Sequence, residues 1–203
     1  LALAMGMAAR PALALDECGA GAPGGTVTCT PAGNSFPNGI EYKVNDLTVV
    51  VQDGVIINTT GGAEPGGIVS GGGAYGDLVI KAGTASGAGV TITTDGDDAE
   101  GISIVTDGTA TITSFADIAT SGKNAQGLYA AAADGVSIAS TGDITTKGTG
   151  SEGIYAYAAG GPVVVSSKGD ITTGPGDGAE GIWAISKTDA VTGPAVRKRN
   201  ENR

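Results

Sequence analysis

The chain repeats itself about every 26 residues, and this period constrains its fold more than any other feature. The segments DAEGISI, NAQGLYA, GSEGIYA and GAEGIWA align on a glycine at positions 101, 127, 153 and 181. The segments TITTDG, DIATSG, DITTKG and DITTGP align on an isoleucine at positions 92, 118, 144 and 171. A third series comprises Ile112, Ile138 and Val165, and a looser copy with Ile57 and Gly67-Ile68 precedes them. Because three columns share one period, we expect consecutive copies of one structural unit.

Each copy contains three short runs in which apolar and polar residues alternate. In the copy that begins at Gly127, the runs are Gly127–Ala131, Val136–Ala139 and Ile144–Thr146. Alternation with β-branched residues is typical of strands, because successive side chains of a strand point to opposite faces. None of these runs has the 3.6-residue period of an amphipathic helix. The sequence therefore predicts an all-β fold.

A single copy cannot bury its apolar face, so neighbouring copies must stack. If the chain coils, each strand lies parallel to its counterpart one coil later, about 4.8 Å away, and equivalent positions form columns. A propeller blade needs more residues and antiparallel hairpins, and leucine-rich repeats need a denser leucine pattern. We therefore expect a right-handed parallel β-helix, a solenoid, with about 26 residues and three short strands per coil.

The isoleucine column of the second series should lie inside, and the threonine two residues further on should share its face. A buried column of hydroxyls satisfies itself by bonding along the stack or to the backbone at the turn. An ice-binding face is the alternative, but it requires a flat outward threonine array, and the outward neighbours are irregular. The threonines are Thr59, Thr94, Thr120, Thr146 and Thr173, and the outward neighbours are Asn58, Thr93, Ala119, Thr145 and Thr172.

The residue after the motif glycine is aliphatic in every copy and should face inward, so the next residue should face outward. The outward column reads Val69, Ser103, Tyr129, Tyr155 and Trp183. Its last three members form a stripe of aromatic rings on neighbouring strands. One interpretation is a stacking ladder that stabilises the sheet surface, because aromatic pairs on neighbouring strands attract each other. The other is a contact surface for a host or environmental glycan or protein.

Two acidic columns could be interpreted as catalytic, because pairs of carboxylates catalyse the hydrolysis of glycosidic bonds. The first column is Glu100, Gln126, Glu152 and Glu180, and the second is Asp117, Asp143 and Asp170. A feature that recurs once per coil is explained by the coil itself, and turn positions favour aspartate. The chain contains no histidine, which excludes Ser-His-Asp and Cys-His arrangements. We therefore predict no catalytic residues and no cofactor.

A denser acidic cluster, Asp95, Asp97 and Asp98, is a weak candidate for a calcium site. Carboxylate oxygens are the ligands that Ca²⁺ prefers. The spacing of the three residues, however, matches neither the EF-hand loop nor the glycine-rich calcium-roll repeat. Cys18 and Cys29 without a histidine make a poor zinc site. We predict no other metal.

Charge and leader pattern indicate an exported protein that does not bind nucleic acid. The formal net charge of −10 and the pI near 4.2 disfavour nucleic acids and anionic membranes. Residues 1–14 resemble the end of a signal peptide, with the small-x-small cleavage site Ala12-Leu13-Ala14. This stretch is too short to span a bilayer, so we expect no direct membrane insertion. An exported compartment permits a disulfide, and we expect one between Cys18 and Cys29 that caps the N-terminal end of the coil.

We expect four regions along the chain. They are a signal-peptide remnant at 1–14, an N-terminal cap with Cys18 and Cys29 at 15–45, the β-helix repeats at 46–186, and a polar tail at 187–203. The last seven residues, RKRNENR, are basic in an acidic protein. A frameshifted or truncated reading frame fits the abrupt loss of the repeat better than a natural polar tail does.

The export signal, the segment GGTVTC at 24–29 with Cys18, and the stacked G-I-x-A and D-I-x-T columns resemble the start of autotransporter passenger domains (type V secretion). The resemblance covers roughly residues 1–186. It implies a location at the cell surface, associated with the outer membrane, or in the extracellular medium. Full-length relatives end in an outer-membrane β-barrel, and nothing in this sequence resembles amphipathic barrel strands with aromatic girdles.

We therefore expect a non-catalytic surface or secreted module with a structural-stalk or adhesive role. The resemblance does not decide the function, because β-helical passengers carry adhesins, proteases and esterases alike. The alternative is a fragment of a β-helical polysaccharide lyase or hydrolase. Such enzymes usually line a groove with Asp, Lys and Arg on emerging loops, whereas here the loops are short and Lys and Arg total 11 of 203 residues.

Overall fold

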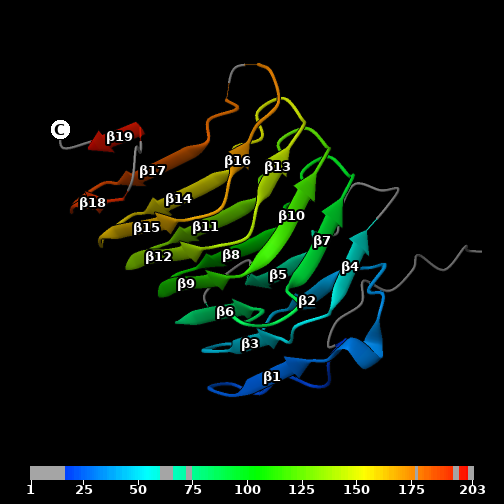
Figure 1. Ribbon diagram of the computed structural model, residues 1–203. Coiled ribbons are helices and arrows are strands. Elements are labelled where there is room, and N and C mark those ends of the chain that lie inside the picture. Colours follow the sequence, from blue (N-terminus) through cyan, green and yellow to red (C-terminus); the bar gives the residue numbers. More distant parts are fainter. Residues whose placement is uncertain (1–16, 60–65, 72–74, 177, 194–196, 201–203) are drawn as a thin grey trace, which may run out of the picture.

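The computed structural model describes residues 17–59, 66–71, 75–176, 178–193 and 197–200. Figure 1 shows these ranges as coils of parallel strands stacked along one axis, and the only helical element among them is a short 3-10 turn, η1 (Pro31–Gly33). The fold is an all-β solenoid of about 5 turns, as the repeat predicts. The signal-peptide remnant predicted at 1–14 lies outside the described residues.

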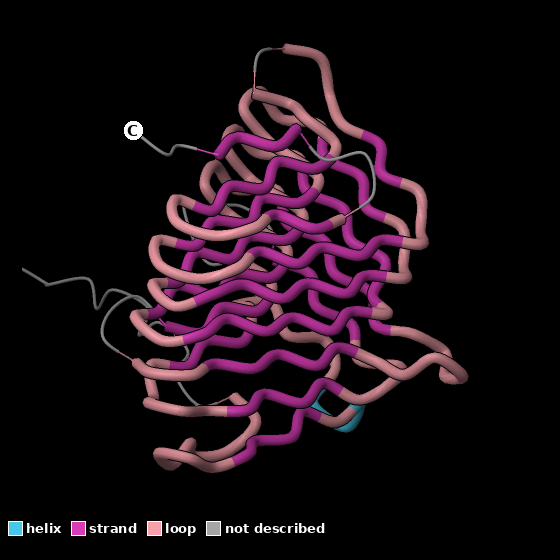
Figure 2. Tube along the Cα trace, turned by 90° about the vertical axis from the view of Figure 1, so that its left-hand side faces the viewer, coloured by secondary structure: helices cyan, strands magenta, loops and turns pink. Residues whose placement is uncertain are grey.

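The chain visits three sheets in a constant order. From β2 to β16, each coil supplies one strand to sheet C, then one to sheet A, then one to sheet B, and β17, β18 and β19 follow in sheets C, A and C. Hydrogen-bonded neighbours therefore come from adjacent coils, which Figure 2 shows stacked on one another. Sheet A contains β1 (Thr26–Cys29), β3 (Thr48–Val51), β6 (Leu78–Ala82), β9 (Thr109–Ser114), β12 (Gly135–Ser140), β15 (Val163–Ser167) and β18 (Val191–Thr192). Sheet B contains β4 (Ile56–Thr59), β7 (Val90–Thr94), β10 (Ala116–Thr120), β13 (Ile144–Thr146) and β16 (Ile171–Thr172). Sheet C contains β2 (Ile40–Tyr42), β5 (Ile68–Gly71), β8 (Ile102–Thr106), β11 (Leu128–Ala132), β14 (Ile154–Ala158), β17 (Ile182–Ser186) and β19 (Arg197–Asn200).

The strand register confirms the repeat columns. Ile118 pairs with Ile92 on one side and with Ile144 on the other. The looser copy belongs to the same solenoid, because Ile57 pairs with Ile92. Its coil is longer, since these two partners are further apart in the chain than Ile118 and Ile144 are. Residues 83–89, which connect β6 to β7, hold part of this extra length.

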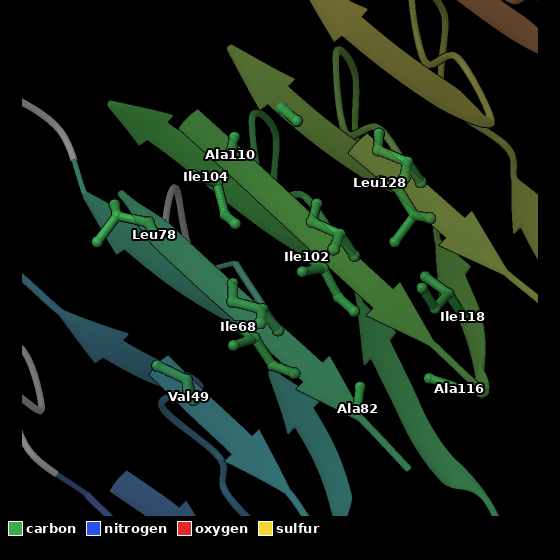
Figure 3. Packing of buried hydrophobic residues seen from close by; sticks show 14 of the residues in the cluster. Val49, Ile68, Leu78, Ala82, Ile102, Ile104, Ala110, Ala116, Ile118 and Leu128 are labelled. Carbon is green, nitrogen blue, oxygen red and sulfur yellow. The ribbon is translucent and has the colours of Figure 1, made fainter. Parts of the chain in front are cut away.

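Small and medium aliphatic side chains fill the interior (Figure 3). Ile68, Ile102 and Leu128 are stacked on successive strands of sheet C, and all three are fully buried. A parallel sheet buried against two others needs such residues, because β-branched and leucine side chains pack closely on a pleated surface. In the last coils Ile171 and Ile182 are only partly buried. The core therefore weakens towards the C-terminal end of the stack.

The glycine column and the isoleucine column pack against each other, which explains why they share one period. At Gly127, an added Cβ atom would lie 2.6 Å from the carbonyl oxygen of Gly153 and even closer to Cγ2 of Ile144. Equivalent contacts surround Gly67, Gly101 and Gly153. Real Cβ atoms essentially never approach other atoms this closely, so only glycine fits at these four positions.

The buried threonine column bonds to the backbone at the turn between sheets B and C. The Oγ1 atom of Thr120 donates to the carbonyl of Ala125 at 2.5 Å, and that of Thr146 donates to the carbonyl of Ser151 at 2.7 Å. Thr94 makes the same bond to Ala99 at 2.6 Å. Of the two hydrogen-bonding schemes expected for this column, the backbone scheme is therefore the one observed at these three threonines, whereas the buried Oγ1 of Thr59 has no hydrogen-bond partner among the described residues.

The predicted Cys18–Cys29 disulfide is confirmed, with the two Cα atoms 4.9 Å apart. It ties the segment before β1 to the last residue of β1. The hydroxyl of Tyr42, a fully buried side chain of β2, accepts a bond from the Cys18 N–H and donates to the Gly19 carbonyl. The predicted cap region 15–45 therefore also contributes two strands, β1 and β2, to the solenoid.

Candidate binding face

Three aromatic side chains stack on the outer surface of sheet C. Tyr129 on β11 pairs in register with Tyr155 on β14, which pairs with Trp183 on β17. The ring centroids of Tyr129 and Tyr155 are 5.0 Å apart with planes inclined by 9°, whereas Tyr155 and Trp183 meet edge to face at 5.9 Å. Because the rings cover one another, each side chain is partly rather than fully exposed. The aromatic stripe thus has the geometry of a stacking ladder, and part of each side chain still reaches the solvent.

A second outward column lies two residues further along the same strands. It consists of Val105, Ala131, Tyr157 and Ile185, of which Ile185 is buried with 8% of its surface exposed. Nζ of Lys187 lies 5.5 Å from the ring centroid of Tyr157, in the position of a cation–π contact. We call this column together with the aromatic stripe the aromatic face. The second column has only one aromatic member, so the repeat pattern gives no signal for it, although strand alternation places it outside.

The carboxylates of the first acidic column border the aromatic face, because each lies three residues before a member of the outward column. Nε2 of Gln126 donates to Oε2 of Glu152 at 2.9 Å and to the carbonyl of Gly150 at 3.3 Å. The Gln126 and Glu152 side chains are 9% and 5% exposed. Burial raises the pKa of Glu152; the bond from Gln126 opposes this, and the charge of Glu180 adds to it. The repeat pattern indicates a corner position for this column and gives no sign of its burial.

The same carboxylates act on the tyrosines of the stripe. Burial raises the pKa of the Tyr129 phenol, and the charges of Glu100 and Glu152 raise it further. Burial also raises the pKa of Tyr155, with smaller contributions from Tyr129 and Glu152. Negative charge therefore lies beside the rings, and both phenols remain neutral at physiological pH.

The aspartate column on sheet B joins consecutive coils. Oδ1 of Asp117 accepts the backbone N–H of Asp143 at 3.1 Å, and Oδ1 of Asp143 accepts that of Asp170 at 2.9 Å. All three side chains are exposed. Asp117 and Asp143 thus each satisfy an amide of the next coil, which is the architectural role expected of a residue that recurs once per coil.

Other carboxylates make the same coil-to-coil bond. Asp77 accepts both the N–H and the hydroxyl of Thr109 at 2.8 Å, and these bonds lower the pKa of Asp77. Asp53 accepts bonds from the hydroxyl and the N–H of Thr84. Both bonds lower the pKa of Asp53, and the bond from the hydroxyl lowers it more. Much of the acidity of the chain therefore holds neighbouring coils together.

The candidate calcium cluster is exposed, and two of its members bond to the next coil. Oδ1 of Asp97 accepts the N–H of Lys123 at 2.8 Å, and Oδ1 of Asp98 accepts Nδ2 of Asn124 at 3.1 Å. Within the described ranges, no group of three or more His, Cys, Asp or Glu side chains is arranged to hold a metal ion. In the cluster of Asp95, Asp97 and Asp98, the latter two therefore act as coil-to-coil carboxylates.

No protein-family model matches the chain, and no curated protein or solved structure matches it significantly. In the part of the chain that the structure describes, no helix is long and apolar enough to cross a membrane. The surface of the solenoid is therefore the basis on which a function is assigned.

The outer face of sheet A is nearly uncharged, a feature that the period of the repeat does not reveal. In a chain of net charge −10, the described strands place one charged residue, Lys81, in its two outward columns. The columns read Thr26, Thr48, Val79, Thr111, Ser137, Val164 and Thr192, and Thr28, Val50, Lys81, Thr113, Ala139 and Ser166. The face is chemically uniform, so it lacks the convergent polar groups of a specific site. The aromatic face is the one that combines rings with charge.

Proposed function

We propose that this protein is a non-catalytic, exported β-solenoid module of the autotransporter passenger kind, in which the stack of coils is a stalk and the aromatic face is its adhesive surface. The observation that carries the proposal is the aromatic stripe on the outside of sheet C. Four of the chain's aromatic residues, Tyr129, Tyr155, Tyr157 and Trp183, lie on this one face. Tyrosine and tryptophan are among the residues most enriched at binding hot spots.

Two further observations support an exported location. The Cys18–Cys29 disulfide is compatible with an oxidising compartment, because thiols in the cytosol are kept reduced. The solenoid also matches the fold that the autotransporter resemblance implies, with strands that recur once per coil. Both belong to the stalk and do not depend on what the aromatic face binds.

The non-catalytic part of the proposal rests on how the carboxylates are used. Asp117 and Asp143 accept backbone amides of the next coil, and Glu152 is buried against Gln126. A general acid and base for glycoside cleavage need to reach the scissile bond from both sides. Purified protein incubated with uronate-containing and neutral glycans should leave their chain lengths unchanged. Turnover of either glycan by homogeneous protein would overturn this part.

The adhesive part is tested with two matched variants. Tyr155→Ser should reduce binding to cells, glycan arrays or protein partners and should lower the free energy of unfolding by only about 0.2–1 kcal/mol. Thr145→Ser, on the outer side of sheet B, should leave both properties unchanged. If Tyr155→Ser lowers stability and leaves all adhesion intact, the stripe is a structural ladder only.

A further inference from the structure

We propose that the aromatic face binds basic polypeptide segments, in which Arg or Lys side chains meet the tyrosine and tryptophan rings and the adjacent glutamates. This inference rests on the proposed adhesive function and names the chemistry of the partner. Three features of the described residues carry it: the charge beside the rings, a cation already on the face, and the register of a basic strand at its end.

The charge beside the rings is negative. Glu100 and Glu152 are close enough to Tyr129 for their charges to raise the pKa of its phenol. Glu180 stands in the same position relative to Trp183, three residues earlier in the chain. A ring face and a carboxylate side by side attract an ammonium or guanidinium group, and both repel an anion. The net charge of −10 steers cationic partners towards the molecule as well.

The chain itself supplies an example of such a contact. Nζ of Lys187 lies 5.5 Å from the centroid of the Tyr157 ring, on the outer surface of sheet C. Cation–π pairs of this kind are weak at exposed sites and strengthen when the cation is desolvated. A basic segment that covers the face would reproduce this contact at the neighbouring rings.

The end of the face is continued by a basic strand. β19 (Arg197–Asn200) lies beside β17 (Figure 1) and pairs with it in parallel. Arg197 is in register with Trp183, and Arg199 is in register with Ile185. The backbone thus places an Arg-Lys-Arg sequence at the register positions of sheet C, one strand beyond the last ring.

A neutral glycan is a weaker candidate for this surface. The acidic column would gain no opposite charge from a neutral ligand, whereas a basic segment supplies one. A glycan that contains uronates would add repulsion.

Fluorescence tests the proposal directly, because Trp183 is the one tryptophan of the chain. A ten-residue peptide of alternating Arg and Ser is titrated into the full chain at about 150 mM salt, where long-range attraction is screened beyond about 8 Å. We expect saturable binding with a change in Trp183 emission. The peptide in which Glu replaces Arg should produce no change.

Three variants separate the face from the overall charge. Tyr157→Ser and Glu180→Gln should each lower the affinity for the Arg–Ser peptide by about three- to tenfold. This is the equivalent of one exposed cation–π or ionic contact. The double variant Asp117→Asn and Asp143→Asn removes more charge on sheet B and should change the affinity less than about twofold. Circular dichroism of each variant checks that it is folded.

The outcomes distinguish failure of the basic-partner inference from failure of the adhesive function. If only the sheet B double variant weakens binding, or Trp183 emission does not change, the peptide binds non-specifically and the inference is wrong. If the Arg–Ser peptide fails but a glycan binds and Tyr155→Ser abolishes that binding, the adhesive function stands and the basic partner is wrong. If neither ligand binds, both proposals fall.

Discussion

Ile144 and Asp143 are neighbours in the chain but lie on opposite sides of sheet B. Ile144 is 1% exposed and stacks between Ile118 and Ile171, whereas the Asp143 side chain is exposed. A charge at Ile144 would have no partner in an aliphatic column. Because side chains alternate along a strand, placing a charge at the inward position should lower the free energy of unfolding by several kcal/mol more than placing it at the outward neighbour.

We expect Ile144→Asp to destabilise the protein by about 3–5 kcal/mol, because it buries an unpaired charge. Asp143→Ala should cost about 1 kcal/mol or less, since it removes one exposed bond to the Asp170 amide. Urea unfolding followed by circular dichroism measures both variants. Equal destabilisation by the two substitutions would contradict the register of sheet B.

Gly127→Ala should destabilise the protein by about 1–3 kcal/mol, because the new methyl group overlaps Ile144 and the Gly153 carbonyl. Gly181→Ala is the matched control: there the nearest atom to an added Cβ is Cγ2 of Ile171, at 3.9 Å. Thermal unfolding of the two variants should show a clear loss only for Gly127→Ala. A comparable loss at Gly181 would mean that packing between the two columns does not explain the motif glycine.

The pH dependence of stability should contain a contribution from Glu152. Its pKa is raised by burial, so the folded protein holds a proton that the unfolded chain has already released. The stability contributed by this carboxyl is therefore fully present at low pH and is lost as the pH rises from the unfolded pKa to the folded one. Glu152→Gln, which keeps an oxygen acceptor for Gln126, should raise the melting temperature at pH 7 and not at pH 4. A lower melting temperature for the variant at pH 7 would contradict this sign.

At the scale of elements, the first strand of sheet A depends on a covalent link. β1 has one neighbour, β3, and its outer edge carries no further strand among the described residues. Exposed strand edges promote pairing with other chains. The disulfide ties the segment before β1 to Cys29 of β1, and the N–H of Cys18 donates to the hydroxyl of Tyr42 on β2. We infer that this link keeps the edge strand in place.

Removal of the disulfide by Cys18→Ala and Cys29→Ala should lower the free energy of unfolding by about 2–3 kcal/mol, on a loop-entropy argument for a closed loop of this size. It should also raise the tendency to aggregate, which light scattering measures. Peptide mapping of unreduced, exported protein checks that the bond forms. Two free thiols in folded, oxidised protein would refute the assignment.

At the scale of the whole molecule, almost every strand is bonded to a partner in another coil. The pairing of β1 with β3 joins Thr26 to Thr48, and the pairing of β4 with β7 joins Ile57 to Ile92. Contacts between residues so far apart in the chain require long loops to close before any bond forms, which slows folding. Folding of a solenoid can also start in one coil and spread to its neighbours, so coils at the two ends differ in stability.

We expect the protein to refold over seconds or longer after dilution from denaturant. Stopped-flow fluorescence of Trp183, which lies on β17 near the C-terminal end of the stack, measures the rate. Refolding in microseconds would indicate that the fluorescence reports local structure alone. Equilibrium unfolding followed by Trp183 should precede unfolding followed by circular dichroism, because the core is least complete at that end.

The period of the repeat by itself determined the fold, the register and the inward residues. Equivalent positions of a coil must meet the same neighbours, so a sequence that repeats in three columns leaves one way to stack them. The same logic placed Tyr129, Tyr155 and Trp183 outside. Cys18 had one possible partner within the chain, because Cys29 is the only other cysteine. These inferences needed no distances.

Only the tertiary structure decided what lies between columns. Gly127 directly precedes β11, whereas Ile144 begins β13, and the pattern does not show that the isoleucine column excludes a side chain from the glycine column. The burial of Glu152, the position of Lys187 over Tyr157 and the nearly uncharged outer face of sheet A depend equally on how coils and side chains meet. A repeat specifies which residues are equivalent, because it is a symmetry of the chain. The distances between residues that are not equivalent follow from packing in three dimensions.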